Sequence, residues 1–340
     1  MKSFRKLARA GVASALIALT AFAGGCGTQT AQKDVTPAKK EAETSKGVVE
    51  FKYPEWVYYD LVYLADDLGY FKDAGIRPKY VGQIAAGQMI PSLISGDLDV
   101  ANRHTPLVIA AVASGADVKI FAAGSQSTQQ FPHMKYFVRA DSDIHGIPDL
   151  GGKTIGMNSF GACSEFVTKK ALKDSGIDPS TLKFKTAPDS QQEIPLLKGD
   201  TDLAIIHPLA SGRAAANKKD FRMLFSDWDL DHGVSGVCPY SASGKFLREH
   251  PDAVKELVDI LSRAAKWNNE HPEEARKMMA KRFNFKLEET ERFEFFPDQM
   301  IPENTIDYWF ERLIDEKKIT PGQIKKEDVY TNQYNPAYKG

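Results

Sequence analysis

Two phrases in this sequence occur twice in the same order. LISGDLDVA (residues 93–101) returns as LLKGDTDLA (196–204), and upstream of them KDAGIRP (72–78) returns as KDSGIDP (173–179). An array of short repeats would show many copies at a period of roughly 20–50 residues. Two copies at a long period instead indicate two similar lobes.

Strand-like and helix-like patterns alternate around each phrase. In the first copy we expect strands at 48–53, 76–81, 98–101 and 118–122, and helices at 59–70, 87–95 and 106–114. In the second copy we expect strands at 153–157, 182–186, 202–206 and 221–225, and helices at 163–174, 191–197 and 208–217. This alternation predicts an α/β fold of parallel β-α-β units. Gly75, Gly96, Gly176 and Gly199 are expected to end helices in a left-handed conformation.

The repeat stops near residue 239, and a helical tail follows. Helices are predicted at 251–268, 272–283 and 305–317, and we expect them to pack on the first lobe. The chain would cross between the lobes near 135–143 and return near 235–241, which makes a two-crossing hinge. The expected organisation is therefore a signal peptide (1–25), a flexible tether (26–47), lobe one (48–137 plus 238–340) and lobe two (138–237).

The N-terminus has the pattern of an export signal. A basic start (Lys2, Arg5, Lys6 and Arg9) precedes the apolar run 11–23 and then Gly24-Gly25-Cys26. This is typical of a cleaved secretory signal, and the run is short for a membrane-spanning helix. Either Cys26 is lipidated and becomes the first mature residue, or it is incidental to an ordinary signal. The polar segment 27–47 lacks the apolar content to fold and suits a tether. We expect a lipid-anchored protein on the extracytoplasmic face of the cell membrane.

Composition excludes several function classes. The 340 residues carry a formal net charge of −1, which gives no electrostatic reason to expect nucleic-acid binding.

Cys163 and Cys238 would form either one disulfide or two free, partly buried thiols. The sequence has no CxxC, no HExxH and no tight His/Cys cluster, so we expect no metal site and no cofactor.

The order of several segments resembles a known family. GYFKDAGI, LISGDLDVA, DLGGKTIGM, LLKGDTDLAIIHP and FLREHPDAVKEL follow one another within residues 50–283. In this order they resemble the nitrate/sulfonate/taurine family of ABC-importer substrate-binding proteins, whose relatives include pyrimidine-precursor binders of thiamine salvage. The resemblance implies a two-lobed periplasmic-binding-protein fold of type II. It also implies a protein, expected to be a monomer, that hands a small solute to an ABC permease with its ATPase.

The ligand is expected where loops follow the carboxyl ends of the strands, because that is where open α/β sheets bind ligands. The candidate ligand-binding residues in these loops are Trp56, Tyr58, Tyr59, Arg103, His104, Thr105, Gln126, Asn158, Ser159, Phe160, Gly161, Cys163, His207 and His232.

Each loop has an alternative interpretation. Arg103, at the start of a helix, offers a planar fork for a carboxylate, sulfonate or phosphate, or it pairs with an acid on the surface. His104 suits a neutral hydrogen-bond donor, and without partners we do not expect it to bind metal. Ser159 either contacts ligand or caps a helix, and Cys163 has no base in its own motif that would make it a nucleophile. His232 either touches ligand or shapes the hinge.

The aromatic loop 54–59 leaves the ligand class open. Trp56, Tyr58 and Tyr59 would stack on a flat ligand, close the cleft as a lid, or pack beneath the loop. The favoured function is import of a small anion such as a sulfonate, nitrate, a taurine-like compound or an aromatic acid. The alternatives are a binder of a pyrimidine or another flat heterocycle, and a module that presents ligand to a sensor.

An enzyme is the rival class. Synthases of the thiamine pyrimidine share the fold, but the cysteine-rich motif that marks them is missing here, and no loop combines a nucleophile, a base and an orienting group. We therefore expect no catalytic residues.

Overall fold

The computed structural model describes residues 47–339 of the chain, which lie in one compact unit. The predicted signal peptide, the lipidation at Cys26 and all but the last residue of the predicted tether lie outside these residues. Within 47–339, none of the helices combines the length and the apolar character that a membrane crossing needs.

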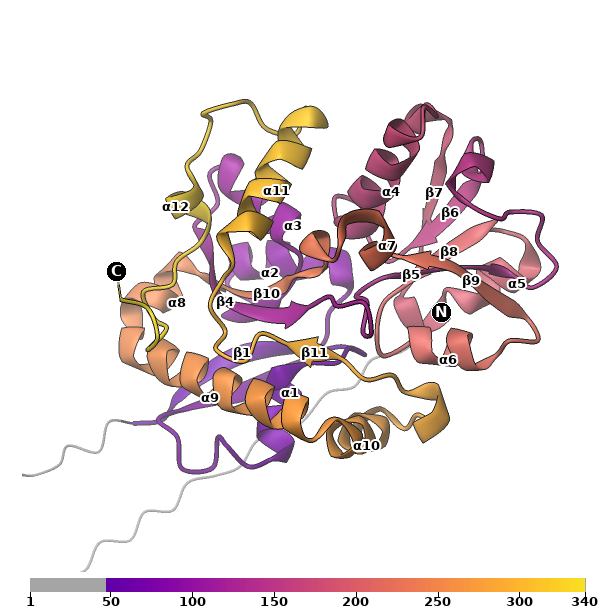
Figure 1. Cartoon of the computed structure of the whole chain (residues 1–340). Coiled ribbons are helices and arrows are strands. Elements are labelled where there is room, and N and C mark those ends of the chain that lie inside the picture. The colour runs from indigo at the N-terminus through magenta and orange to yellow at the C-terminus, as the bar shows by residue number, and fades with distance from the viewer. Residues whose placement is uncertain (1–46, 340) are drawn as a thin grey trace, which may run out of the picture. The chain divides into compact units, whose positions relative to one another are not determined.

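Strands and helices alternate through both repeats, as the sequence predicts (Figure 1). The strands are β1 (Val49–Glu55), β2 (Ile76–Gln83), β3 (Val100–Asn102), β4 (Val118–Gln126), β5 (Lys135–Arg139), β6 (Thr154–Met157), β7 (Lys183–Thr186), β8 (Leu203–Ile206), β9 (Phe221–Ser226), β10 (Cys238–Ser243) and β11 (Glu294–Phe295). The helices are α1 (Leu61–Asp67), α2 (Met89–Ser95), α3 (Thr105–Ala113), α4 (Cys163–Asp174), α5 (Glu193–Lys198), α6 (Ser211–Ala216), α7 (Asp227–Asp231), α8 (Gly244–Glu249), α9 (Pro251–Glu270), α10 (Pro272–Phe283), α11 (Glu303–Asp315) and α12 (Lys326–Val329).

The strands form a separate set of sheets in each lobe. In lobe one, β1 pairs in parallel with β2, and a four-stranded sheet has the order β11-β4-β10-β3, in which β10 runs antiparallel to β3 and β4. Lobe two has one five-stranded sheet in the order β7-β6-β8-β5-β9, parallel among β6, β7 and β8. β5 and β9 join it antiparallel, so each lobe mixes the expected parallel β-α-β units with antiparallel strands.

The chain crosses between the lobes twice, but the first crossing comes earlier than expected. β4 ends at Gln126 in the sheet of lobe one, and β5 begins at Lys135 in the sheet of lobe two. The crossing is therefore residues 127–134, not 135–143. The sequence prediction missed β5, whose pairing with β8 and β9 places 135–137 in lobe two. The return lies between α7 and β10, close to the expected 235–241.

The repeated phrases have the same structural role in both lobes. Gly96 (φ 81°) and Gly199 (φ 74°) end α2 and α5 in the left-handed conformation, where a glycine avoids the clash of a Cβ. The second Asp of each phrase accepts a hydrogen bond from a backbone N–H of the first strand of its repeat: Asp99 from Lys52 in β1 (2.8 Å) and Asp202 from Thr154 in β6 (2.7 Å).

The prediction for one repeated glycine is wrong. Gly176 is left-handed (φ 75°), but Gly75 is not, because α1 has already ended and Gly69 (φ 77°) takes the left-handed conformation after it. Gly75 instead lies against α9, and its backbone N–H donates to the Glu256 carboxylate at 3.0 Å.

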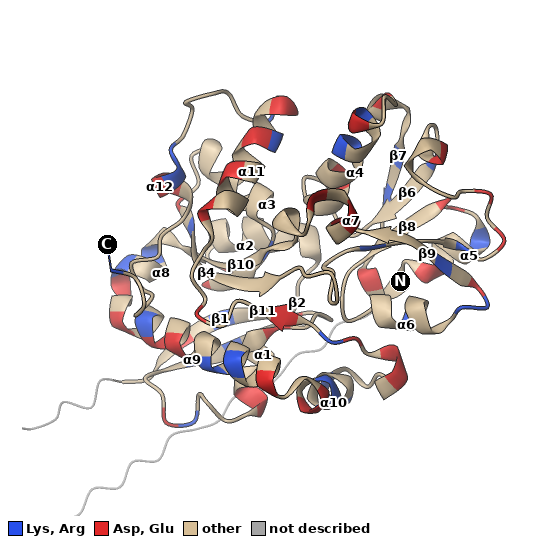
Figure 2. Cartoon of the chain, viewed as in Figure 1, with Lys and Arg blue, Asp and Glu red and all other residues tan. Residues whose placement is uncertain are grey.

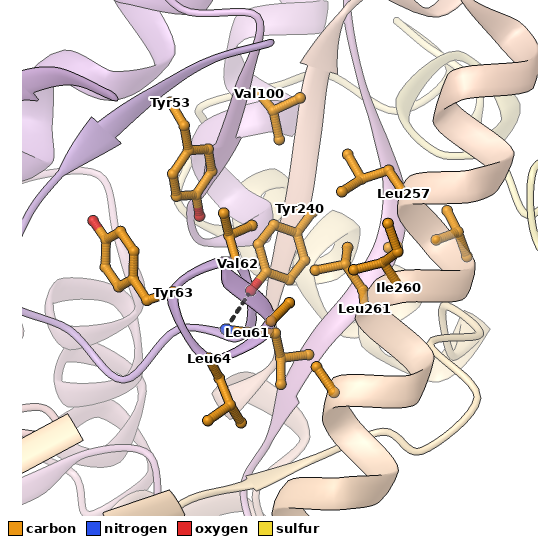
Figure 3. Close-up of a cluster of buried hydrophobic side chains, with 14 of the residues drawn as sticks. Tyr53, Leu61, Val62, Tyr63, Leu64, Val100, Tyr240, Leu257, Ile260 and Leu261 are labelled. Atoms are coloured by element: carbon orange, nitrogen blue, oxygen red, sulfur yellow. Dashed lines mark hydrogen bonds between the residues drawn. The ribbon is translucent and has the colours of Figure 1, made fainter. Parts of the chain in front are cut away.

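A buried carboxylate fixes the start of α1 in the core of lobe one. Asp60 accepts hydrogen bonds from the hydroxyls of Tyr53 (2.6 Å) and Tyr240 (2.9 Å) and from the backbone N–H of Val62 (2.8 Å). Burial raises the pKa of Asp60. Leu61 donates its N–H to the Tyr240 hydroxyl, which is the dashed line in Figure 3. This network holds the end of loop 54–60.

The helical tail packs on lobe one, as expected. α9 and α10 pack against α1, and α11 packs against α3. Figure 2 shows Lys, Arg, Asp and Glu interspersed on these outer helices, whereas β10 carries no charged residue. The tail therefore presents charged side chains of both signs to solvent and encloses the apolar core of lobe one.

Candidate functional site

Three histidines and one cysteine from four separate segments meet in the interior. The ligand atoms of His104, His133, Cys163 and His207 all lie within 4.8 Å of one another, and all four side chains are buried. We call these four residues the His/Cys cluster. It is the site where the segments following β3, β4 and β8 meet the start of α4.

Local structure explains why each member lies there. His104 follows β3 and is the residue before α3, but its side chain caps no backbone group. His207 follows β8, and Cys163 is the first residue of α4. His133 lies on the crossing between the lobes, where its backbone N–H donates to Ser127 Oγ at 3.1 Å. Lobe one, lobe two and the crossing therefore all contribute.

The cysteine sulfur lies at the centre of the cluster. Cys163 Sγ is 3.4 Å from His207 Nε2, 3.4 Å from both ring nitrogens of His104 and 4.0 Å from His133 Nε2. The imidazole rings have centroid separations between 4.8 and 5.5 Å. One sulfur and three imidazole nitrogens thus lie within 4.8 Å of one another.

A carboxylate outside the cluster orients His207. Asp189 Oδ1 lies 2.9 Å from His207 Nδ1 and also accepts the His207 backbone N–H at 3.1 Å. Asn158 Nδ2 donates to the other oxygen of Asp189 at 2.9 Å. Since a carboxylate only accepts, Nδ1 carries the proton and Nε2 faces the cluster.

The buried groups have shifted pKa values. Burial, together with Arg103 and the other histidines, lowers the pKa of His104 and of His133, so both imidazoles are neutral. Burial alone would lower the pKa of His207, but Asp189 and Cys163 raise it. Burial alone would raise the pKa of Asp189, and His207 lowers it. Asp189 and His207 therefore favour each other's charged forms, beside two neutral imidazoles.

Arg103, next to His104 in the chain, is a buried cation without an acidic hydrogen-bond partner. It is 0% exposed, its Nη2 donates to Ser159 Oγ at 3.1 Å, and its guanidinium lies 5.5 Å from the centre of the Trp56 ring. Its Nε and Nη1 have no hydrogen-bond partner among residues 47–339. The alternative of a surface ion pair is therefore wrong for Arg103, and its Nε and Nη1 donate to no group among the described residues.

A cavity of about 500 Å³ lies between the lobes beside these groups. Lobe one contributes Trp56, Ile84 and Gly87 to its wall, and lobe two contributes Asn158, Pro188 and Asp189. Because Trp56 contacts Arg103 and Asp189 contacts His207, the cavity wall connects directly to the buried arginine and to the cluster.

The structure gathers about half of the predicted site residues. Arg103, His104, Cys163 and His207 lie in or beside the cluster, while Trp56, Asn158 and Ser159 lie at the cavity wall or on Arg103. Tyr58 stacks on Trp56 with a centroid separation of 4.4 Å, and its hydroxyl lies 3.5 Å from His133 Nδ1. Thr105 is the buried first residue of α3.

The remaining five predicted residues are neither in the cavity wall nor in the cluster. Tyr59 lies in the core, where its hydroxyl donates to Asn268 at 2.8 Å. Phe160 is 57% exposed, and His232 caps the end of α7 in a left-handed conformation. Gly161 donates its N–H to Glu165, and Gln126 donates weakly to the Phe295 carbonyl at 3.5 Å.

Sequence reasoning missed His133 and Asp189, and it missed the partners of His104. The expectation that His104 has no metal-ligating neighbours is wrong, because three such side chains surround it. One signal was present: in the repeated phrases GDLDVANRH and GDTDLAIIH, His104 and His207 occupy the same position. The two thiols, Cys163 and Cys238, are buried and free.

Comparison with known proteins gives a family match. The model of the family described as NMT1/THI5 like matches residues 56–275. The chain belongs to the NMT1/THI5-like family. The matched range includes the His/Cys cluster, Arg103 and Trp56, so the site lies wholly within the segment that the NMT1/THI5-like family shares.

One curated relative and many solved structures are similar to the chain. The 4-amino-5-hydroxymethyl-2-methylpyrimidine phosphate synthase of Candida albicans is 26% identical over 64% of this chain. The matched part covers 66% of that synthase, just under two thirds of its length. The zinc-bound ligand-binding component of an ABC-type import system from Staphylococcus aureus has a TM-score of 0.68 at 13% identity, covering 85% of this chain and 97% of that one. The periplasmic aliphatic sulphonate binding protein SsuA of Escherichia coli has a TM-score of 0.63 at 16% identity, covering 83% and 91%. These likenesses show the periplasmic-binding-protein fold.

Proposed function

We propose that this protein is the solute-binding component of an ABC importer and that it holds a small anion between its lobes. Three features support this: the fold shared with import-system binding proteins, the cavity between the lobes, and the buried Arg103 behind Trp56 of the cavity wall. A sulfonate, a nitrate or the carboxylate of an aromatic acid has the acceptor geometry that a guanidinium fork recognises.

The observation that carries the proposal is the state of Arg103. Burying a cation without a partner is costly, so buried charges in proteins are normally paired. Arg103 is fully buried, and its Nε and Nη1 have no partner among the described residues. An anionic ligand would supply the acceptors for these two donors and offset their desolvation.

The proposal extends to location and partners. We infer that export and lipidation at Cys26 would hold the protein at the extracytoplasmic face of the membrane, as a monomer, within reach of a permease and its ATPase. Closure of the lobes around the anion would produce the form that the permease recognises. The captured compound would leave unaltered, so the protein would not act as an enzyme.

The test is a binding screen on the purified protein. Thermal shift and calorimetry would compare taurine, methanesulfonate, nitrate, benzoate and an aminopyrimidine on the wild type, on Arg103→Met and on Arg213→Met. Loss of charge-assisted hydrogen bonds of about 1.5–3 kcal/mol should weaken an anion roughly 10- to 100-fold in Arg103→Met. Arg213 is the matched control because it already pairs with Glu193. Equal anion affinity of Arg103→Met and the wild type would contradict the proposal.

A flat heterocycle is the second candidate ligand. Trp56 lines the cavity, and its buried indole Nε1 has no hydrogen-bond partner among the described residues. A heterocycle with an acceptor atom would use this donor. If the aminopyrimidine alone binds, and binds Arg103→Met as well as the wild type, the heterocycle replaces the anion. Chemical change of any bound compound during incubation would favour the enzyme class instead.

A further inference from the structure

We propose that His104, His133, Cys163 and His207 bind one transition-metal ion of the Zn²⁺ class, and that the ion joins the two lobes. This proposal does not depend on the anion at Arg103. It rests on the identity, spacing and burial of the four side chains and on the carboxylate behind His207.

The spacing of the cluster fits a four-coordinate ion. With Zn–S near 2.3 Å and Zn–N near 2.0 Å, a tetrahedral site places its sulfur and nitrogen ligands about 3.5 Å apart. Cys163 Sγ lies 3.4 Å from His207 Nε2, 3.4 Å from His104 and 4.0 Å from His133 Nε2. No pair of ligand atoms exceeds 4.8 Å. Reaching the tetrahedral N···N distance of about 3.3 Å therefore needs side-chain shifts of about 1.5 Å at most.

The donor set selects the class of ion. One thiol sulfur and three imidazole nitrogens suit late first-row metals, whereas Mg²⁺ and Ca²⁺ require oxygen ligands. Four protein ligands with no exposed position make a closed site, which is the arrangement of structural zinc. Co²⁺ has the same preferences and reports thiolate ligation by its colour, so it serves as the spectroscopic probe.

A hydrogen-bond partner outside the cluster orients His207 as a ligand. Metal-binding histidines commonly donate their second ring N–H to a carboxylate, which fixes the tautomer and the ring orientation. Asp189 occupies this position at 2.9 Å from His207 Nδ1, and Asn158 in turn holds Asp189. His207 therefore presents Nε2 to the sulfur of Cys163 without further rearrangement.

Hydrogen bonding within the protein accounts poorly for the cluster. The His104 ring is fully buried, and both of its nitrogens are equally far, 3.4 Å, from the same sulfur. That geometry is not a directed hydrogen bond to either nitrogen, because sulfur is a weak partner and the bond needs one defined donor. A shared cation at the centre would satisfy all four groups together.

The origin of the ligands gives the ion a mechanical role. His104 comes from lobe one, Cys163 and His207 come from lobe two, and His133 comes from the crossing at 127–134. An ion bound to all four joins the lobes directly. Binding to the folded, closed arrangement alone should raise its stability with ion concentration.

The test measures metal binding to the purified full-length protein after treatment with a chelator. Zn²⁺ should bind with a stoichiometry of one and raise the melting temperature. Co²⁺ should give intense tetrahedral bands together with a thiolate-to-cobalt charge-transfer band. Cys163→Ser should abolish the charge-transfer band. Cys238→Ser is the matched control, because Cys238 is equally buried but hydrogen-bonds to Asn102 outside the cluster, and it should keep the band.

The histidines provide a second set of variants. His104→Gln, His133→Gln and His207→Gln should each weaken Zn²⁺ more than Asp189→Asn, for which a loss of about 10- to 100-fold is expected. His232→Gln, at an exposed position, should bind like the wild type. The absence of stoichiometric binding, or a charge-transfer band that survives in Cys163→Ser, would overturn the proposal.

Arg103→Met separates this proposal from the anion proposal. That variant should still bind one Zn²⁺, since Arg103 is not a ligand. Anion binding without metal binding would refute the metal site alone, and metal binding without anion binding would refute the proposed function alone.

Discussion

The loops that follow the repeated GDxD phrase differ between the lobes at a few residues, and the difference gives each lobe its own part of the site. In lobe one the chain continues from Ala101 as Asn-Arg-His, and in lobe two it continues from Ala204 as Ile-Ile-His. The histidines are equivalent, and both point into the cluster. The residue before each histidine is Arg103 in one lobe and Ile206 in the other, and both are buried.

This comparison shows how a duplicated scaffold produces a composite site. The shared strand and glycine place His104 and His207 at matching ends of β3 and β8, so two lobes that face each other bring them together. The unshared residue places a cation on lobe one only. Lobe one therefore carries the charge, while lobe two carries the thiol and the Asp189 that orients its histidine.

The substitution that makes lobe two resemble lobe one at this position should change the stability of the protein the most. Ile206→Arg would bury a cation at the end of β8 among apolar side chains such as Phe137 and Leu196, and should destabilise the protein by about 3–5 kcal/mol. Ile206→Met is the control and should cost less than about 1.5 kcal/mol. Urea denaturation measures both. If the two variants were equally stable, the cost of burying a cation would not explain why lobe two has Ile206 where lobe one has Arg103.

The substitution that makes lobe one resemble lobe two at this position should instead stabilise the ligand-free protein. Arg103→Met removes a buried cation that has only Ser159 as a hydrogen-bond partner, so the ligand-free protein should gain about 1–3 kcal/mol. Arg213→Met, which breaks the ion pair with Glu193, should give no such gain. Thermal melts without ligand make the measurement, and a destabilised Arg103→Met would mean that the protein itself satisfies this charge.

The shared glycines should respond alike. Gly96→Ala and Gly199→Ala force a Cβ into the left-handed region and should each cost about 1–2 kcal/mol. Gly146→Ala is the control, because Gly146 has an extended backbone (φ −174°) that any residue adopts. Denaturation midpoints that differ widely between the first two variants would contradict the equivalence of the two turns.

Substitution of the aspartates that the two phrases share should cause the smallest loss of stability. Asp99→Ala and Asp202→Ala each remove one hydrogen bond, to β1 and to β6 respectively, worth about 0.5–1.5 kcal/mol. The double variant should show the sum of the two losses, since the residues lie in different lobes. A marked departure from additivity, measured by urea denaturation, would indicate that the two lobes unfold separately.

The repeated phrases predicted the fold because their signals are local. Helix ends at Gly96 and Gly199 and the alternation of strands and helices follow from residues close in sequence. β5 escaped prediction because its place between β8 and β9 depends on distant pairing. Tyr59 was expected at the ligand but is buried, since the C-terminal tail supplies Asn268 to bond its hydroxyl.

The candidate site could be predicted only in part, for the same reason. Each loop that supplies His104, Cys163 or His207 was recognised separately from its place after a strand. The repeated phrase links His104 only to His207, and no sequence motif links either loop to Cys163, because the cluster forms only when the lobes approach. His133 was missed because it lies on a crossing whose position the prediction placed a few residues too late.

The position of His133 also determines how a bound ion would leave. Residues 127–134 belong to neither sheet, so His133 lies on the connection between the lobes. An ion held by all four residues would tie His104 of lobe one to Cys163 and His207 of lobe two across this connection. Release of the ion would therefore require that the contact to His104 or the contacts to both residues of lobe two be lost.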